Sequence, residues 1–410
     1  MVKPEIRLKG FEGEWERHSL EECLSISNER NANKKFGRED VLSVSDDFGV
    51  VNQIKFLGRS YAGADLSGYK VVRPGQVIYT KSPLRFKPFG IIKENQKENG
   101  IVSVLYAVYN TPENLLSSFV DLFFTPSYRT NNYLLPLISK GAKNTINISD
   151  EDALKGTIYF PIIEEQKGIT DYFISLDSML QSTTKKIESL KQMKQASLVS
   201  MFPQAGETTP RVRFKGFEGG WVVKKLSSIA KRVTRKNSHL ESTLPLTISA
   251  AEGLIEQTSF FNNVVASSNV SRYYLVKKGE FAYNKSYSNG YPFGAVKRLD
   301  RYDKGVLSTL YIAFSIDEII SSDYIVQFFE TSLWHQEVAK RAAEGARNHG
   351  LLNISADDFL DIEISLPNSK DEQQRIASYF RSLDKQISLQ EQRLEKLKQI
   401  KAACLDKMFV

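Results

Sequence analysis

Basic, amide and hydroxyl side chains recur at matching places in the two halves of this 410-residue sequence. In each half a lysine and a serine follow a predicted strand, and a Gly-rich basic loop comes later. Lysine and serine suit phosphate oxygens, whereas arginine can bind guanine and asparagine can bind adenine in the major groove of DNA. The candidate nucleic-acid-contacting residues are Lys81, Ser82, Lys285, Ser286, Lys143, Asn144, Arg347, Asn348, His349 and Arg59. A solvated turn is the alternative for each of them.

The sequence lacks the motifs of enzymes that act on nucleic acid. It has no Asn/Asp-Pro-Pro-aromatic motif, which adenine methyltransferases carry. Gly345 and Gly350 have the spacing of a phosphate-binding loop, but Leu351-Leu352 stands where Lys-Ser/Thr is required. The four histidines are far apart in sequence, and two cysteines, Cys23 and Cys404, predict neither a disulfide framework nor a metal cluster. We therefore expect no catalytic residue, no metal and no cofactor bound by this chain.

Each half of the chain ends in a segment with the apolar spacing of a coiled-coil helix. Apolar residues recur there in a 4-3-4-3 rhythm, which predicts a seam that packs on a partner helix. The predicted seam and subunit-docking residues are Ile169, Phe173, Leu176, Leu180, Ile187, Leu190, Ile376, Phe380, Leu383, Ile387, Leu394 and Leu397. Both copies break the rhythm at the same steps, Thr183 with Gln390 and Lys194 with Lys401. Shared polar breaks indicate duplication, and the simplest partner of each helix is the other copy.

The two halves also begin alike. The run from Lys9 to Trp15 reads Lys-Gly-Phe-Glu-Gly-Glu-Trp, and a nearly identical run extends from Lys215 to Trp221. A repeat of half the chain implies two whole domains rather than a short-period solenoid. We expect both tryptophans to be buried where these segments pack on their domains. The segments that follow each tryptophan match poorly, so the two domains could recognise different things.

This order predicts an α+β protein in which two similar globular domains, each a mixed β-sheet with helices, alternate with two long coiled-coil helices; that the helices are antiparallel and separate the domains is implied by the family resemblance given below. The arrangement would be circular and pseudo-twofold. The predicted parts are a first domain at 1–164, a central helix at 165–202, a linker at 203–209, a second domain at 210–368 and a C-terminal helix at 369–410. Ser369 with Glu372 predicts a capping box at the start of the second helix.

Composition restricts the class of protein further. The formal net charge of +7 suits a polyanionic partner, and 41% hydrophobic content is ordinary for a globular protein. No apolar run approaches the roughly 18 residues that span a membrane, and the N-terminus lacks the apolar core of a signal peptide. We expect a cytoplasmic protein.

The sequence resembles the specificity subunits of type I restriction-modification systems. The resemblance covers essentially the whole chain and rests on the duplicated Lys-Gly-Phe-Glu-Gly-x-Trp segments, the paired Asn-Ile-Ser turns at Asn147 and Asn353, and the Glu-Gln openings of the helices at Glu165 and Glu372. It implies two target-recognition domains, each reading half of a split DNA sequence, and helices that dock two methyltransferase subunits. It also implies S-adenosylmethionine in the methyltransferase partner, and ATP and Mg²⁺ in the restriction (translocase/endonuclease) subunits that join this core.

We therefore interpret the chain as a non-catalytic DNA-recognition subunit that directs adenine N6 methylation and, with restriction subunits, cleavage. Because the variable segments differ, the recognised bipartite site should be asymmetric. One alternative is an enzyme that modifies or cleaves DNA in its own right. The other is a coiled-coil scaffold without sequence readout.

Overall fold

The computed structural model of the chain describes residues 2–84, 86–140, 146–249, 252–261, 269–286, 291–342 and 352–410. The chain forms two compact units, the first of residues 1–184 with 392–410 and the second of residues 185–391. The divisions fall inside the two longest helices, α5 (Ile163–Ser200) and α10 (Lys370–Lys407), so each helix contributes to both units. The domain bounds expected from the sequence stay a prediction.

The first unit is built on a four-stranded antiparallel sheet. Its strands, in spatial order, are β2 (Ser25–Ile26), β9 (Tyr106–Asn110), β6 (Val77–Thr80) and β7 (Ile91–Glu94). Two-stranded antiparallel pairs surround it: β1 (Glu16–Ser19) with β12 (Thr157–Phe160), β3 (Leu42–Ser45) with β4 (Gly49–Asn52), β5 (Lys70–Val72) with β8 (Gly100–Val102), and β10 (Ser139–Lys140) with β11 (Ile146–Asn147). The shorter helices are α1 (Leu20–Cys23), η1 (Arg38–Asp40), α2 (Gln53–Leu57), α3 (Ser117–Phe124), α4 (Ser127–Leu134) and η2 (Asp152–Leu154).

The second unit has the same strand order at corresponding positions. Its sheet consists of β14 (Ala230–Arg232), β21 (Ile312–Ile316), β18 (Phe281–Asn284) and β19 (Ala295–Arg298). The pairs are β13 (Val222–Lys225) with β22 (Glu363–Leu366), β15 (Leu246–Ser249) with β16 (Gly253–Glu256), and β17 (Tyr274–Lys277) with β20 (Lys304–Leu307). The shorter helices are η3 (Leu226–Ser228), α6 (Gln257–Phe261), α7 (Ser322–Phe328), α8 (Leu333–Arg341) and α9 (Ala356–Leu360).

A glycine turn opens the central strand of each sheet. Gly75 and Gly279 have φ angles of 84° and 87°, a conformation that glycine adopts at little cost because it lacks Cβ. The strands that follow, β6 and β18, are buried along most of their length. Each is central in its sheet and carries the candidate lysine directly after its last residue.

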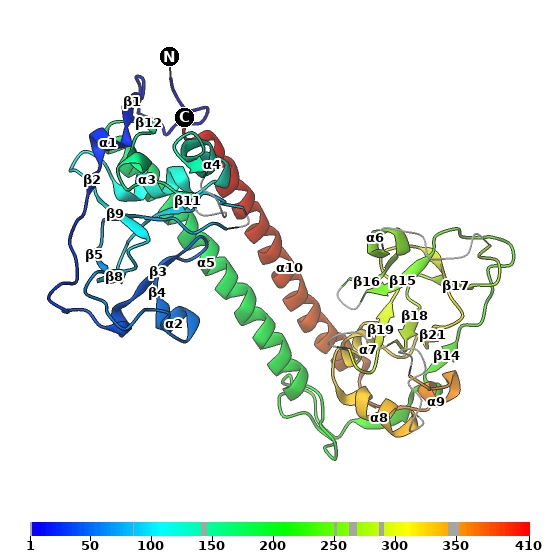
Figure 1. Cartoon of the computed structure of the whole chain (residues 1–410). Coiled ribbons are helices and arrows are strands. Elements are labelled where there is room, and N and C mark those ends of the chain that lie inside the picture. The colour runs from blue at the N-terminus through cyan, green and yellow to red at the C-terminus, as the bar shows by residue number, and fades with distance from the viewer. Residues whose placement is uncertain are drawn as a thin grey trace. The chain divides into compact units, whose positions relative to one another are not determined.

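The core of the first unit includes residues from both ends of the chain. Trp15 is buried, as predicted, and its ring centroid lies 5.8 Å from that of Phe119 and 6.4 Å from that of Phe409. Phe173 of α5 packs in the same cluster. The backbone N–H of Ile6 donates to the carbonyl of Lys407 at 2.9 Å, so the two terminal segments lie side by side (Figure 1).

The core of the second unit repeats this arrangement. Phe202, which follows the end of α5, packs between Trp221, Tyr324 and Phe380. The backbone N–H of Val212 donates to the carbonyl of Ser200 at 2.9 Å. Each unit therefore includes the start of one long helix and the Met-Phe end of the other.

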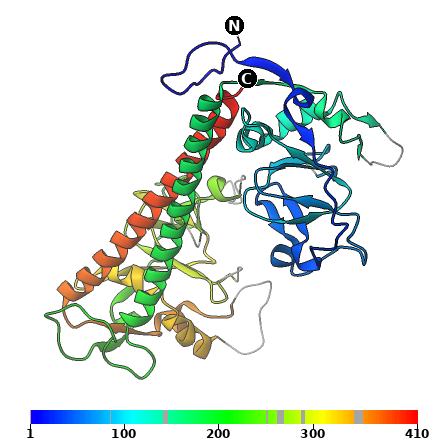
Figure 2. The same cartoon turned by 90° about the vertical axis from the view of Figure 1, so that its left-hand side faces the viewer.

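Within each unit the two long helices run antiparallel. In the first unit Tyr172 and Asp177 of α5 contact Cys404 and Lys401 of α10, so residue numbers rise in opposite directions along the pair (Figure 2). In the second unit Lys194 contacts Asp384, and Ser197 contacts Tyr379. In the described part of the chain, none of the helices combines the length and apolar character that crossing a membrane requires.

Candidate nucleic-acid interface

Lys81 contacts the turn that contains the Asn-Ile-Ser sequence of the first unit. Its Nζ donates to the carbonyl oxygen of Ile148 at 2.6 Å and to Oδ1 of Asp150 at 2.9 Å. Lys70 donates to the other carboxylate oxygen of Asp150. Burial raises the pKa of Asp150, but the hydrogen bonds from the two lysines outweigh this and hold it below its ordinary value. Lys81 therefore anchors the turn through a carboxylate that is ionised at neutral pH.

Lys285 makes part of the same contact in the second unit. Its Nζ donates to the carbonyl oxygen of Ile354 at 3.2 Å, and its own carbonyl accepts from the backbone N–H of Leu352 at 2.9 Å. Ala356 stands where the first unit has Asp150, so this lysine lacks the matching carboxylate. The Nζ of Lys285 is thus better placed than that of Lys81 to bind an external anion.

The serines of the two Asn-Ile-Ser turns start short helices. The side-chain oxygen of Ser149 accepts from the N–H of Asp152 at 2.9 Å at the start of η2. Ser355 is the N-cap of α9 and accepts from the N–H of Asp358 at 3.0 Å. These caps explain why the motif recurs, because each satisfies a backbone donor at a helix start.

The remaining candidate residues lie in different surroundings. Ser82 is exposed, and Ser286 is half-buried with its N–H donating to Asn284 Oδ1 at 3.0 Å. Arg59 is exposed after α2, with its guanidinium carbon 4.6 Å from the ring centroid of Tyr61. The other predicted contacts lie outside the described residues; these are Lys143, Asn144, Arg347, Asn348 and His349. DNA contact by all ten residues stays a prediction.

The predicted seam residues of α5 and α10 pack within the chain itself. Nine of the twelve are buried, and Leu180, Leu394 and Leu397 are half-buried. Their docking of other subunits stays a prediction. Large apolar side chains on the same helices are instead exposed: Ile174, Met179, Met193, Val199, Leu389 and Ile400.

Two of the four polar breaks in the seam, both lysines, form ion pairs between the helices. Lys194 Nζ lies 2.7 Å from Asp384 Oδ1 in the second unit, and Lys401 Nζ lies 2.5 Å from Asp177 Oδ1 in the first. Thr183 is buried and donates to the carbonyl of Met179 one turn earlier at 2.7 Å. In the antiparallel pairing each lysine meets an aspartate of the other helix, which favours this register.

A bidentate ion pair attaches the first segment of each half to the start of a long helix. Arg7 donates from Nε and Nη2 to the two carboxylate oxygens of Glu165, both at 2.7 Å. Arg213 does the same to Glu372 at 2.7 and 2.8 Å. The carboxylate of Glu165 raises the pKa of Arg7 above its ordinary value. The predicted capping box is wrong, because Glu372 binds Arg213 rather than the backbone of Ser369.

The glutamine that follows each of these glutamates holds a loop in place. Gln166 donates to the carbonyl of Pro161 at 2.9 Å and accepts from the N–H of Leu116 at 3.0 Å. Gln373 donates to Pro367 at 3.0 Å and accepts from Ser321 at 2.8 Å. The Glu-Gln pair therefore joins the start of each long helix to the end of the last strand of its unit. It also joins that helix to the residue that precedes α3 or α7.

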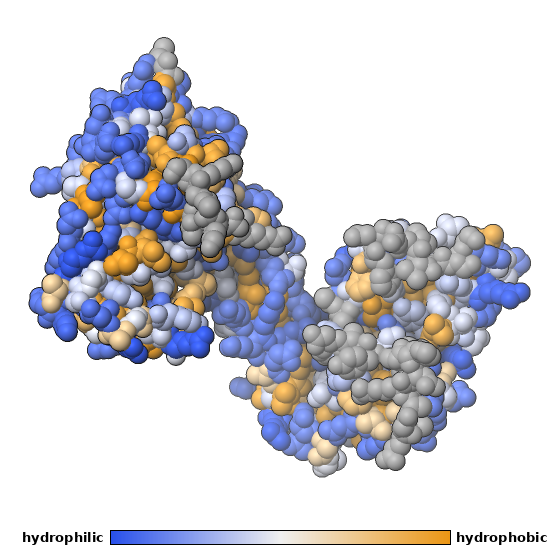
Figure 3. Space-filling model, in the orientation of Figure 1, coloured by the Kyte–Doolittle hydropathy of each residue, from blue (hydrophilic) through white to orange (hydrophobic). Residues whose placement is uncertain are grey.

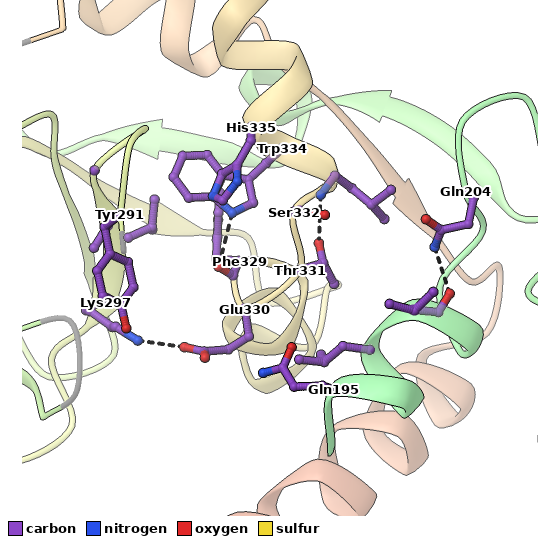
Figure 4. A pocket seen from close by; sticks show the side chains of 16 residues that line it. Gln195, Gln204, Tyr291, Lys297, Phe329, Glu330, Thr331, Ser332, Trp334 and His335 are labelled. Carbon is purple, nitrogen blue, oxygen red and sulfur yellow. Dashed lines mark hydrogen bonds and ion pairs between the residues drawn. The ribbon is translucent and has the colours of Figure 1, made fainter. Parts of the chain in front are cut away.

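A cavity of about 390 Å³ in the second unit lies between the end of α5, β19 and the start of α8 (Figure 4). Lys297 Nζ lies 2.6 Å from Glu330 Oε1 at one side of it. Trp334 donates to the carbonyl of Phe329 at 3.1 Å, and burial lowers the pKa of the neighbouring His335. These four side chains are engaged in an ion pair, a hydrogen bond or ring packing. Among the described residues, no group of three His, Cys, Asp or Glu side chains could hold a metal ion.

The surface visible in Figure 3 is mostly hydrophilic in each unit, with apolar residues in small groups. In the first unit, Phe48 and Phe56 are both exposed, with ring centroids 5.2 Å apart.

Comparison with known proteins shows one similar family and several similar folds. Residues 219–399 match the family model described as the type I restriction modification DNA specificity domain. The chain is similar to the HsdS subunit from Thermoanaerobacter tengcongensis, with 16% sequence identity, a TM-score of 0.52 and 96% of each chain covered. It is also similar to the S subunit of a type I restriction-modification system from M. genitalium, with 13% identity, a TM-score of 0.54, and 100% and 99% of the two chains covered.

A third similar structure concerns complex assembly and conformational transition of the type I R-M system, with 15% identity, a TM-score of 0.51 and coverage of 96% and 97%. No curated protein sequence matches the chain. Nearly the whole chain thus has the α+β fold of type I specificity subunits, and the predicted resemblance and fold class are confirmed.

Removing one arginine should test the helix junction. Arg213→Ala leaves Glu372, whose side chain is 2% exposed, without its partner, so we expect a loss of about 3–5 kcal/mol in the free energy of unfolding. The matched control is Arg211→Ala, which breaks an exposed pair with Glu207 and should lower the stability much less. Denaturant titration measures both, and equal losses would contradict the assignment.

The two lysines should differ in how they affect DNA affinity. We expect Lys285→Ala to weaken binding at all sequences and to reduce the slope of log affinity against log salt by about 0.9, as loss of one phosphate contact does. Lys81→Ala should weaken binding without that change in slope, because its amine already has two internal acceptors. Titrations at several salt concentrations measure both quantities. Unchanged affinity of both variants at low salt would rule out a role for either lysine.

Proposed function

We propose that this chain is the DNA sequence-recognition subunit of a type I restriction-modification complex. The observation that carries the proposal is the match of residues 219–399 to the DNA specificity domain, together with the same strand order in the first unit. The net charge of +7 and the basic residues at matching positions of both units support a polyanionic partner.

Each unit supplies one reading domain in this proposal, and the two read different half-sites. The scaffolds share strand order and anchoring lysines, but the side chains around them differ. Asp150 and Lys70 of the first unit correspond to Ala356 and Tyr274 of the second. Similar frames with different side chains support an asymmetric site in two parts, separated by a spacer that neither domain reads.

The long helices hold the two reading domains and dock two methyltransferase subunits. Their exposed apolar residues, such as Ile174, Met193 and Leu389, support a protein partner, since exposed apolar side chains on a helix are suited to a second hydrophobic surface. The methyltransferase partner binds S-adenosylmethionine and methylates adenine N6. Restriction subunits use ATP and Mg²⁺ for translocation and cleavage, and the complex acts in the cytoplasm. This chain takes no part in the chemistry beyond choosing the site.

Selection from a random pool of duplex DNA tests this proposal against the two alternatives. The complex of the chain with its methyltransferase should enrich one asymmetric sequence in two parts with a fixed gap. Replacing residues 1–164 with the corresponding domain of another family member should change one half of that sequence only. Enrichment of no sequence would favour the coiled-coil scaffold. Methylation or cleavage by the isolated chain would favour an enzyme.

A further inference from the structure

A buried asparagine closes a short loop in each unit. Asn31 and Asn237 are fully buried, and the backbone N–H of each donates to the carbonyl of a tyrosine, Tyr69 or Tyr273, at 3.0 Å. The side-chain amide of Asn237 donates to the carbonyl of Ser242 at 2.7 Å, and its oxygen accepts from the N–H of Ser242 at 3.2 Å. Asn31 makes the same pair of bonds to Phe36 at 2.9 and 3.1 Å. We name residues 32–35 and 238–241 the Asn-anchored loops.

Both loops hold one residue in a rarely populated backbone conformation. Lys34 and Leu240 have φ angles of 55° and 54°, and among the described residues they are the non-glycine residues with positive φ. The left-handed conformation is unfavourable for a side chain with Cβ and persists where the surroundings fix it. Its recurrence at corresponding places indicates that the loop shape itself is maintained in both units.

The side chains on this shared frame are exposed and differ at every position. The first loop reads Ala32-Asn33-Lys34-Lys35, and the second reads Ser238-His239-Leu240-Glu241. A fixed backbone that presents different exposed side chains is the arrangement expected of a recognition loop on a rigid scaffold.

A second duplicated turn lies beside each loop. Ser103 to Tyr106 and Ser308 to Tyr311 share the pattern Ser-x-Leu-Tyr and the same turn hydrogen bond from the tyrosine N–H to the serine carbonyl, at 3.0 and 3.2 Å. Their leucines, Leu105 and Leu310, are 64% and 62% exposed. The turn follows β8 or β20, whose partner strand forms a bridge with the residue that precedes the buried asparagine, Arg30 or Lys236.

In the second unit these two elements border a hollow of about 530 Å³. It is lined by Lys236, Ser238, Ser271, Arg272, Tyr273 and Thr309. In the part of the chain that the structure describes, neither Lys236 nor Arg272 forms an ion pair, whereas the adjacent Arg235 pairs with Glu280 at 2.9 Å. Two cations and several hydroxyl groups around one hollow have the chemistry that binds phosphodiester oxygens.

We propose that the Asn-anchored loop and the neighbouring Ser-x-Leu-Tyr turn form the DNA-reading surface of each unit. In the second unit Lys236 and Arg272 bind the DNA backbone, and the exposed side chains of residues 238–241 face base edges. Leu310 supplies an apolar contact of the kind that thymine methyl groups or groove walls accept. In the first unit Arg30, Lys34 and Lys35 supply the charge. This inference rests on the proposed function and assigns it to particular residues.

The salt dependence of DNA binding tests the backbone contacts in the assembled complex with methyltransferase. The double variant Lys236→Ala/Arg272→Ala should reduce the slope of log affinity against log salt by about 1.8, twice the value for one phosphate contact. The control Lys215→Ala/Lys224→Ala removes equal charge from exposed positions outside the hollow and should leave the slope unchanged. An unchanged slope in the first variant, or an equal fall in both, would overturn the inference.

A loop graft tests base readout on the same surface. Ser238→Ala, His239→Asn, Leu240→Lys and Glu241→Lys together place the first loop's side chains on the second frame, which already holds residue 240 at a matching φ. DNA selection should then give an altered second half-site and an unchanged first one. An unaltered sequence would overturn the inference alone, whereas absence of any selected sequence for the unmodified complex would overturn the proposed function instead.

Discussion

A buried carboxylate at the start of each long helix determines how the rest of its unit is attached. Glu165 and Glu372 are almost fully buried, and an ionised group there requires a charged partner that satisfies both oxygens. Arg7 and Arg213 provide this from the first segment of each half. The arginine also donates to the carbonyls of Gly13 or Gly219, so the same side chain shapes the turn that leads to the buried tryptophan. One interaction therefore joins the helix, the first segment and the core.

The cores impose a second constraint, because each is completed by the end of the other helix. Phe409 packs on Trp15 and Phe119, and Phe202 packs on Trp221 and Tyr324. A unit that lost this phenylalanine would expose apolar surface in its centre, which is costly in a close-packed core. The ion pairs of Lys194 and Lys401 lie on the same helices and favour the antiparallel register. Helix ends, helix register and domain cores are thus mutually dependent within each unit.

The sequence predicted the features that depend on spacing and local pattern. The seam rhythm could be read from neighbouring residues, and so could the burial of Trp15 and Trp221. Features that depend on partners distant in sequence could not. Glu372 fits a capping box by its position after Ser369, yet its partner Arg213 lies more than a hundred residues earlier. The position of Lys81 after a strand predicted a contact with phosphate, but in the structure its amine donates to Asp150 Oδ1.

The Asn-anchored loops could not be predicted from the sequence either, because their shape depends on contacts with the backbone of other segments. Their exposed side chains share almost nothing, so the segments match poorly, while the buried amide that shapes them bonds mainly to backbone atoms. One signal was available: a basic residue followed by asparagine occurs at Arg30-Asn31 and again at Lys236-Asn237.

The most direct test of DNA recognition by this chain is to co-express it with its methyltransferase and map modified adenines across the host genome by single-molecule sequencing. The account predicts methylation confined to one asymmetric two-part sequence with a fixed gap, and methylation without such a pattern from an assembled complex would contradict it.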